Sequence, residues 1–290
     1  MEYSDYIKTR EYKNEETGFD PDESQYPADI FDHQKSIVTW ACKRGRAGVF
    51  MDTGLGKTIT QLTWADQVQR KTDGYVILLA PLAVAHQTER EAKKFGLDAT
   101  FVSNESEINE PGIYITNYEK LHHFDPVIFS GVVLDESSIL KGMNGTLRKM
   151  ITEFFSATPY RLSCTATPSP NDFMELGTQS EFLGIMSQVE MLAMFFIHDT
   201  GGGTGEWRLK HHGKSKFWKW LSTWCVFMRS PADIGFDSDG YDLPPVKYYQ
   251  HTIETTPDNG QLFIEPAQGL QDRNKARRDT VRYRCEKAAE

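Results

Sequence analysis

The sequence has few cysteines, no long hydrophobic run and no excess of positive charge. Its four cysteines are scattered and form no Cys-x-x-Cys pair, which argues against a thiolate zinc site and a disulfide framework, and indicates a reducing compartment. The longest apolar run, residues 76–85, contains Pro81 and is too short to span a membrane. Residues 1–16 have no apolar core, so they do not resemble a signal peptide.

The net charge is acidic, since 32 Lys and Arg oppose 41 Asp and Glu and give −9. Residues 1–30 alone hold nine acids against three bases, so we interpret them as an acidic arm or a loosely packed edge. The remaining chain is nearly balanced, which is compatible with a local basic surface that binds nucleic acid. A length of 290 residues fits one large domain or two ordinary ones.

Short apolar runs alternate with segments of helical spacing over residues 31–184. Runs that are apolar throughout are typical of strands buried on both faces of a parallel sheet. They occupy residues 47–52, 75–81, 99–103, 112–117, 131–135 and 160–167. Because helical segments separate them, we expect an α/β fold in which helices sandwich a parallel sheet.

The alternation ends near residue 184. An apolar, methionine-rich segment and a glycine-rich loop follow, and then an aromatic stripe with the spacing of a helix packed on one face: Phe217, Trp220, Leu221 and Trp224. The expected organisation is an arm (1–30), a main α/β lobe (31–184), a small helical insertion (185–224), one or more returning strands (225–256) and a polar helical linker (257–290).

Residues 51–58, MDTGLGKT, follow a predicted strand and open a predicted helix, as a phosphate-binding loop does. Gly54 and Gly56 allow backbone N–H groups to face phosphate oxygens, and the helix N-terminus adds partial positive charge. Lys57 is expected at the β- and γ-phosphates and the Thr58 hydroxyl on Mg²⁺. The expected nucleotide-binding residues are Thr53, Gly54, Leu55, Gly56, Lys57 and Thr58. Because the strict motif has glycine in place of Met51, a plain glycine-rich turn is the alternative.

Two acids, Asp135 and Glu136, end another predicted strand, at the edge of a parallel sheet where ligands bind. Asp135 is expected to hold Mg²⁺, and Glu136 to orient or deprotonate the attacking water. An apolar strand ending in Asp-Glu is equally compatible with a structural role when it stands alone. Together with Lys57 earlier in the chain, the pair indicates an NTPase, with Lys57, Asp135 and Glu136 as catalytic residues.

Six segments in order resemble the motifs of the superfamily 2 helicases, especially the SNF2-like branch of phages and prophages. They are residues 31–34 (FDHQ), 51–58, 80–82 (APL), 115–119 (ITNYE), 135–138 (DESS) and 165–168 (TATP). The DxGxGKT form of the family's first motif accommodates Met51. Residues 175–184, 206–218 and 243–245 add further similarity to the phage-type proteins.

The resemblance implies a RecA-like P-loop NTPase lobe, with ATP and Mg²⁺ as cofactors. It also implies that Gln34 recognises adenine and that Thr165 and Thr167 couple hydrolysis to motion. Relatives have a second lobe that supplies arginine fingers, and Arg277 and Arg278 do not match that motif. We therefore expect a first motor lobe with its linker. Since arginine fingers contribute about 10³–10⁵ in rate, weak nucleotide binding and slow hydrolysis are expected of this chain alone.

The resemblance places contacts with the nucleic-acid backbone at Pro81, Thr116 and Asn117, at the ends of predicted strands. Plain turn chemistry is the alternative for these three. Residues 206–229 hold six bases against one acid, interleaved with aromatic residues. This pattern suits phosphate tracking and base stacking, although the aromatic stripe is more simply a packing face. Lys210, Lys214 and Lys216 are candidate DNA contacts.

These observations favour an ATP-dependent translocase or helicase that acts on DNA, duplex rather than single-stranded, with RNA left open. A motor subunit of a restriction or nuclease system is one alternative. A nucleotide-sensing DNA-binding module without turnover is the other. We expect a monomer in the cytoplasm of a bacterium or a phage-infected cell, with no membrane partner and no metal besides Mg²⁺.

Overall fold

The computed structural model describes residues 16–141, 145–169, 171–199, 206–241, 247–252 and 270–289. The chain divides into two compact units, residues 1–242 and 243–290. In the second unit, residues 247–252 have no regular secondary structure, and α9 (Leu270–Asp279) and α10 (Val281–Ala289) expose almost all of their described side chains. All the predicted site residues lie in the first unit.

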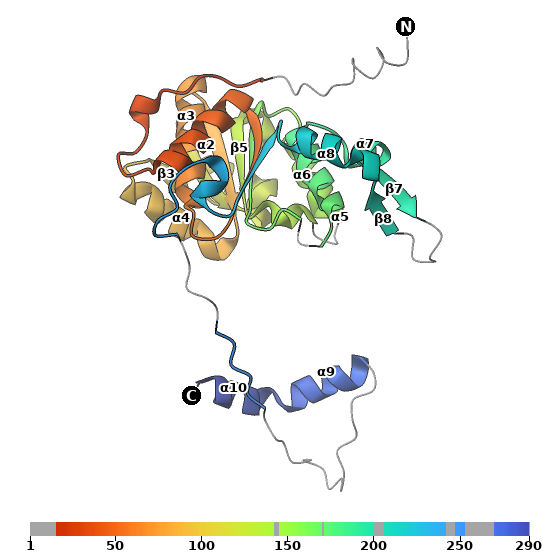
Figure 1. The fold of residues 1–290 in the computed structure, drawn as a ribbon. Coiled ribbons are helices and arrows are strands. Elements are labelled where there is room, and N and C mark those ends of the chain that lie inside the picture. Colours follow the sequence, from red (N-terminus) through yellow and green to blue (C-terminus); the bar gives the residue numbers. More distant parts are fainter. Residues whose placement is uncertain are drawn as a thin grey trace, which may run out of the picture. The chain divides into compact units, whose positions relative to one another are not determined.

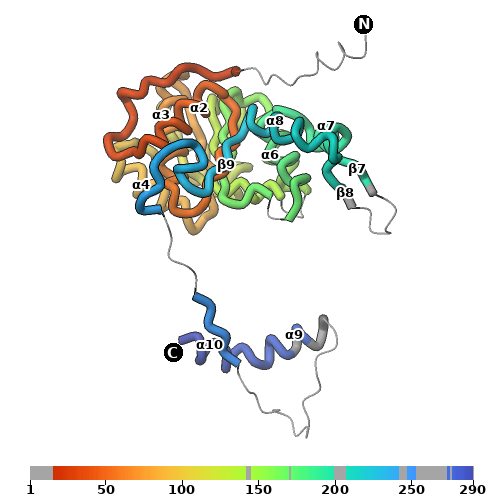
Figure 2. Tube along the Cα trace, viewed as in Figure 1, coloured from red at the N-terminus to blue at the C-terminus, as the bar shows by residue number. Residues whose placement is uncertain are grey.

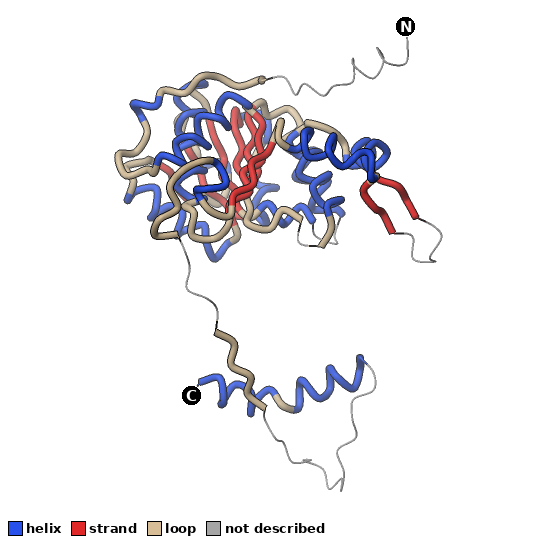
Figure 3. The backbone as a smooth tube through the Cα atoms, viewed as in Figure 1, coloured by secondary structure: helices blue, strands red, loops and turns tan. Residues whose placement is uncertain are grey.

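The first unit is built on a seven-stranded sheet with the order β3-β4-β2-β5-β6-β1-β9, shown in red in Figure 3. Every strand pairing in it is parallel. The strands are β1 (Arg46–Met51), β2 (Tyr75–Ala80), β3 (Ala99–Phe101), β4 (Ile113–Asn117), β5 (Phe129–Asp135), β6 (Tyr160–Cys164) and β9 (Cys225–Met228). The six strands expected between residues 47 and 167 are all present, which confirms the predicted α/β fold with a parallel sheet.

Helices cover both faces of the sheet (Figures 1 and 2). One hydrophobic core joins Val133 and alternate strand residues to α2 (Asp32–Arg44), α3 (Lys57–Thr72) and α4 (Leu82–Lys94). The other core joins Val132 and its counterparts to α5 (Gly145–Phe154), α6 (Leu176–Leu183), α7 (Gln188–Phe195) and α8 (Lys214–Leu221). Because neighbouring residues of one strand face opposite cores, the strand sequences are apolar at nearly every position.

Gly131 allows α3 to approach the sheet closely. A Cβ atom at this position of β5 would lie 2.8 Å from Val68 Cγ1 on α3, too close without a shift of the helix or the side chain. The contact places α3, which begins at Lys57, directly over β5, which ends at Asp135. The same packing that builds the core therefore brings the two halves of the predicted site together.

Residues 185–224 contain α7, α8 and a two-stranded antiparallel hairpin of β7 (Phe196–Asp199) and β8 (Glu206–Leu209). The glycine-rich loop at residues 201–205 lies outside the described residues. The hairpin was not among the predicted elements. A sequence signal for it exists, because charged and apolar residues alternate over residues 206–209 next to a glycine-rich segment.

The aromatic stripe along α8 and the turn that follows it packs inward. Phe217, Trp220, Leu221 and Trp224 are all buried, which confirms the packing interpretation for these four residues. Trp218 remains 40% exposed and contacts Phe173 edge-to-face, with ring centroids 5.2 Å apart. The stripe therefore anchors α8 to the core and leaves one aromatic ring at the surface.

The described part of the N-terminal segment packs against α2 and α3. Tyr26 and Ile30 are buried in the core that these helices share, and the backbone N–H of Asp22 donates to Gln67 on α3. Residues 1–15 of the expected acidic arm lie outside the described residues. No helix among the described residues is both long enough and apolar enough to cross a membrane.

Candidate nucleotide-binding site

Three loops meet at the carboxyl edge of the sheet. β5, β6 and β1 are neighbours and run parallel, so the segments that follow them leave the sheet on the same side. Lys57 follows β1, Asp135 and Glu136 follow the apolar part of β5, and Thr165 follows β6. Only one strand separates the phosphate-loop candidate from the two acids, at the edge where parallel sheets bind ligands.

The loop that precedes α3 has an open, glycine-dependent backbone. Gly54 and Gly56 have φ angles of +84° and +79°, in the left-handed region that favours glycine. A Cβ atom at Gly54 would meet nothing within 4 Å, so space is open beside the loop. Gly56 is the N-cap of α3, and the first turn of α3 contains no acid. The helix N-terminus is therefore suited to an anion.

Lys57 folds back over this loop. Its Nζ atom donates to the carbonyl oxygens of Met51 at 2.9 Å and Asp52 at 3.2 Å. These bonds use two of the three N–H donors of the ammonium group. Thr53 is exposed and Thr58 is partly exposed, so both side chains can reach a molecule at the loop.

Gln34 on α2 is buried beneath the loop. Its Nε2 atom donates to the Leu55 carbonyl at 3.0 Å, and its Oε1 atom accepts from the Phe31 N–H at 3.1 Å. A Cβ atom on Gly56 would overlap Gln34 Nε2, so this close approach requires glycine as well. One end of the amide supports the loop and the other caps the N-terminus of α2, and the role of Gln34 in recognising adenine stays a prediction.

Asp135 has contacts from two other elements. Gln61 Nε2, on α3, donates to Asp135 Oδ1 at 2.9 Å, and the hydroxyl of buried Tyr118 donates to its backbone carbonyl at 2.7 Å. Burial raises the pKa of the Asp135 carboxyl above its ordinary value. The Gln61 hydrogen bond and the Lys57 charge oppose this rise in pKa, and the Glu136 charge adds to it. A cation bound here would relieve the penalty on the buried charge.

Replacing Asp135 with Asn should raise the melting temperature at about pH 7, measured without nucleotide or Mg²⁺, because it removes a buried charge. The pKa of Asp135 is higher in the folded chain than in the unfolded chain, so ionisation destabilises the fold. The penalty is absent when the pH lies below the pKa of Asp135 in the unfolded chain. It develops as the pH rises through the pKa of Asp135 in the folded chain. The advantage of Asp135→Asn should therefore shrink toward about pH 4. An equal or lower melting temperature near neutrality would contradict the burial argument.

Glu136 is held by hydroxyl groups. Its Oε1 atom accepts from Thr165 Oγ1 at 2.7 Å and from Ser138 Oγ. The Thr167 N–H donates to Thr165 Oγ1 at 3.0 Å, so Thr165 connects Glu136 to the loop after β6. The φ angle of Glu136 is +54°, a strained value for a residue with a side chain. The coupling role proposed for Thr165 and Thr167 has a direct contact to act through.

Buried glutamines contact Asp135 and the residue that follows Glu136. Besides Gln61, Gln179 on α6 donates from Nε2 to the Ser137 carbonyl at 3.0 Å and accepts from Ser163 Oγ on β6. Sequence reasoning missed these glutamines and Tyr118. Gln61 alone has a recognisable signal, since it lies one helical turn after Lys57 and therefore on the same side of α3.

The residues present fit a magnesium-bound nucleoside triphosphate. Lys57 and the N-terminus of α3 supply positive charge beside open space at Gly54. The Thr58 hydroxyl and the Asp135 carboxylate are oxygen donors of the kind that Mg²⁺ prefers. The donor set therefore matches the chemistry expected from the sequence.

The three nucleic-acid candidates at strand ends differ in accessibility. Thr116 and Asn117 are buried, and Asn117 Oδ1 accepts from the Lys120 N–H at 3.0 Å, which caps the short helix that follows β4. Pro81 is partly exposed ahead of α4. Turn chemistry accounts for Asn117 in this structure, and a nucleic-acid contact at the three positions stays a prediction.

The three candidate lysines also differ. Lys210 Nζ donates to the carbonyl oxygens of Ala193 at 2.8 Å and Met194 at 2.9 Å, near the C-terminal end of α7. A cation at a helix C-terminus stabilises the helix, so Lys210 has a structural role here. Lys214 and Lys216 lie exposed on α8, where both can reach a phosphate.

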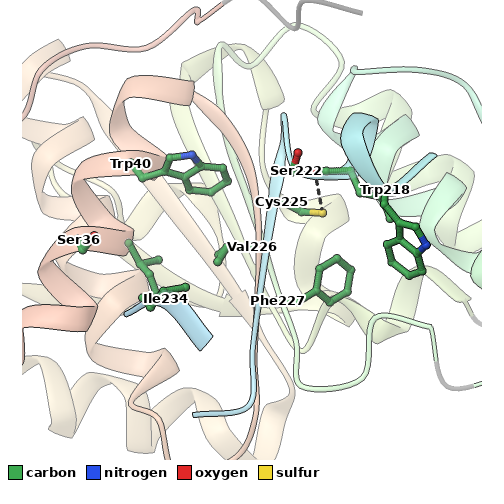
Figure 4. Close-up of a pocket in the computed structure, with 10 residues that line it drawn as sticks. Ser36, Trp40, Trp218, Ser222, Cys225, Val226, Phe227 and Ile234 are labelled. Carbon is green, nitrogen blue, oxygen red and sulfur yellow. Dashed lines mark hydrogen bonds between the residues drawn. The ribbon is translucent and has the colours of Figure 1, made fainter. Parts of the chain in front are cut away.

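A separate apolar groove of about 490 Å³ borders the sheet at β9 (Figure 4). Trp40 of α2 and Val226 lie on one side of the strand, and Phe227 and Trp218 of α8 lie on the other. Its lining residues include none of the predicted site residues. The groove is therefore distinct from the nucleotide-binding candidate.

Comparisons with known proteins match one family model and several solved structures. Residues 28–170 match the model of a family described as the res subunit of type III restriction enzymes. The chain is similar to the solved SWI2/SNF2 ATPase core of Sulfolobus solfataricus in complex with dsDNA, at 22% identity over 70% of this chain and 45% of that chain, with a TM-score of 0.56. A second structure of that core domain gives 19% identity over 78% and 48% of the two chains, and the same TM-score.

At sequence identities of 22% and 19%, the similarity to these two structures shows a shared fold and nothing more. This chain spans less than half the length of either of those two chains. No curated protein sequence matches it significantly.

Proposed function

We propose that residues 28–170 form the N-terminal motor lobe of a superfamily 2 helicase, and that the chain is part of an SNF2-like, ATP-dependent translocase that acts on DNA. The observation that carries the proposal is the placement of Lys57, Asp135 and Glu136 at one edge of the sheet, after two parallel strands that only β6 separates. Support for duplex DNA as the partner comes from exposed Lys214 and Lys216, and from the dsDNA bound by the similar Sulfolobus core.

In this proposal, Lys57 and the N-terminal amides of α3 bind the phosphates of ATP. Thr58 and Asp135 would hold Mg²⁺, which would offset phosphate charge. Glu136 accepts a proton from the attacking water. Thr165 donates a hydrogen bond to Glu136 Oε1, and the loss of this hydrogen bond would couple hydrolysis to motion. Lys214 and Lys216 contact backbone phosphates without reading sequence.

Titration calorimetry with a non-hydrolysable ATP analogue and Mg²⁺ tests nucleotide binding. Lys57→Ala should weaken affinity about 10- to 100-fold, because hydrogen bonds to charged groups contribute about 1.5–3 kcal/mol. Lys94→Ala, which removes an exposed lysine on α4, should leave affinity unchanged. Absence of heat from the wild-type chain at millimolar nucleotide would rule the proposal out.

Replacing both Lys214 and Lys216 with Ala should weaken binding to duplex DNA and reduce the slope of log affinity against log salt by about 2, since each lost phosphate contact lowers it by about 1. The reduction should be the same for unrelated DNA sequences. The matched control is Lys94→Ala with Lys149→Ala, two exposed lysines on α4 and α5. If both double variants give the wild-type slope, the α8 lysines do not contact DNA.

The matched family favours a second candidate, the motor subunit of a restriction or nuclease system. Both candidates share this lobe and differ in what happens to the DNA. With its partners and ATP, a restriction motor would cut a closed plasmid, whereas a simple translocase would leave it intact.

A further inference from the structure

Gln61 connects the helix of the phosphate loop to the strand that carries the acids. It lies on α3, one turn after Lys57, and is fully buried. Its Nε2 atom donates to Asp135 Oδ1 at 2.9 Å across 74 residues of sequence. Among the described side chains, Gln61 alone donates a hydrogen bond to this carboxylate.

That bond distinguishes the two oxygens of Asp135. Oδ1 is occupied by the amide of Gln61, while the Tyr118 hydroxyl fixes the backbone carbonyl of the same residue. A carboxylate held at one oxygen presents the other in a fixed direction, as partners of metal-binding carboxylates commonly do. Gln61 therefore sets the orientation in which Asp135 meets a cation.

Gln61 also has an unsatisfied atom. Its Oε1 is buried and accepts no hydrogen bond, which is uncommon for a buried polar atom unless a ligand or water supplies the donor. Because Oε1 and Nε2 belong to one amide group, this acceptor lies beside the Asp135 carboxylate. Gln67, also buried on α3, has both ends engaged, by the Asp22 N–H at 3.0 Å and Asp66 Oδ2 at 3.4 Å.

We propose that Gln61 is a positioning residue for magnesium. Its Nε2 holds Asp135 so that the second carboxylate oxygen faces the ion, and its Oε1 accepts a hydrogen bond from a water molecule that the ion binds. The inference rests on the proposed function, since it requires a magnesium-bound nucleotide at this edge of the sheet. It adds to the site a residue outside the motifs found in the sequence.

Calorimetry of a non-hydrolysable ATP analogue, with Mg²⁺ and with EDTA, tests this role. The quantity compared is the gain in nucleotide affinity that Mg²⁺ produces. Gln61→Met keeps the length of the side chain and removes the amide, and should reduce that gain about 10- to 100-fold while leaving affinity in EDTA unchanged. Gln67→Met, the matched control on the same helix, should keep the wild-type gain.

If Mg²⁺ increases the nucleotide affinity of Gln61→Met as much as that of the wild-type chain, the proposal is overturned. An equal loss of affinity with and without Mg²⁺ would also overturn it, because it would mean that the substitution disturbs the phosphate loop itself. If Gln61→Met shows no thermal unfolding transition, Gln61→Asn, whose amide is one methylene too short to reach Asp135, is judged by the same criteria. If the wild-type chain binds no nucleotide, the proposed function fails, and the wild-type titration shows this before any variant is compared.

Discussion

Replacing Glu136 with Gln should slow ATP hydrolysis about 10²- to 10⁴-fold, the usual contribution of a general base. Nucleotide affinity should stay the same or rise slightly, because the change removes a negative charge near the triphosphate. The amide has nearly the size of the carboxylate, and its oxygen can still accept from Thr165 Oγ1, which lies 2.7 Å from Glu136 Oε1. The loop should therefore keep its conformation and lose only the general base.

The rate is measured with radiolabelled ATP and saturating duplex DNA, and affinity by calorimetry. Radiolabel is used because it detects slow hydrolysis. Glu119→Gln, which removes an exposed carboxylate beyond β4, is the control and should hydrolyse at the wild-type rate. Equal hydrolysis by both variants would remove Glu136 from the mechanism, and no hydrolysis by any of them would favour a nucleotide-sensing module without turnover.

The sheet could be predicted because strands buried on both faces leave continuous apolar runs in the sequence. The order of the strands could not, since β1 pairs with β6 and β9, which both come much later in the chain. β9 follows an insertion whose hairpin has only four residues in each strand. Such short strands give a weak periodic signal compared with the helices around them.

The motif residues could be located because each follows a strand that the sequence shows. The groups that hold them could not, apart from the position of Gln61 one turn after Lys57 on α3. Gln61 contacts Asp135 across 74 residues, and Gln179 contacts Ser137 across 42 residues. A hydrogen bond between residues far apart in sequence leaves no pattern in a single sequence. Arg161 is a similar case, because a charged residue within an apolar run gives no sign of where its charge is satisfied.

Replacing Arg161 with Met should destabilise the fold by about 3–5 kcal/mol. Arg161 is 3% exposed, and its guanidinium donates to the carbonyl oxygens of Thr158 at 2.8 Å, Phe182 at 2.7 Å and Ser156. Burial, with the charge of Arg46, lowers the pKa of Arg161 to about 10, so the group stays charged at neutral pH. Methionine would fill most of the volume and leave three carbonyl groups without a donor, each at a cost of about 1–3 kcal/mol.

Thermal unfolding measures this effect, and a loss of that size corresponds to a melting temperature lower by about 10 °C. Arg46→Met is the matched control on the adjacent strand. Among the described residues, Arg46 donates only to the Pro159 carbonyl, and its removal also relieves repulsion with Arg161, so its effect should be much smaller. Equal stability of the two variants would mean that carbonyl groups do not stabilise the buried charge.

Arg161 lies at the amino edge of the sheet, opposite Lys57, so Arg161→Met that remains folded should bind nucleotide with wild-type affinity.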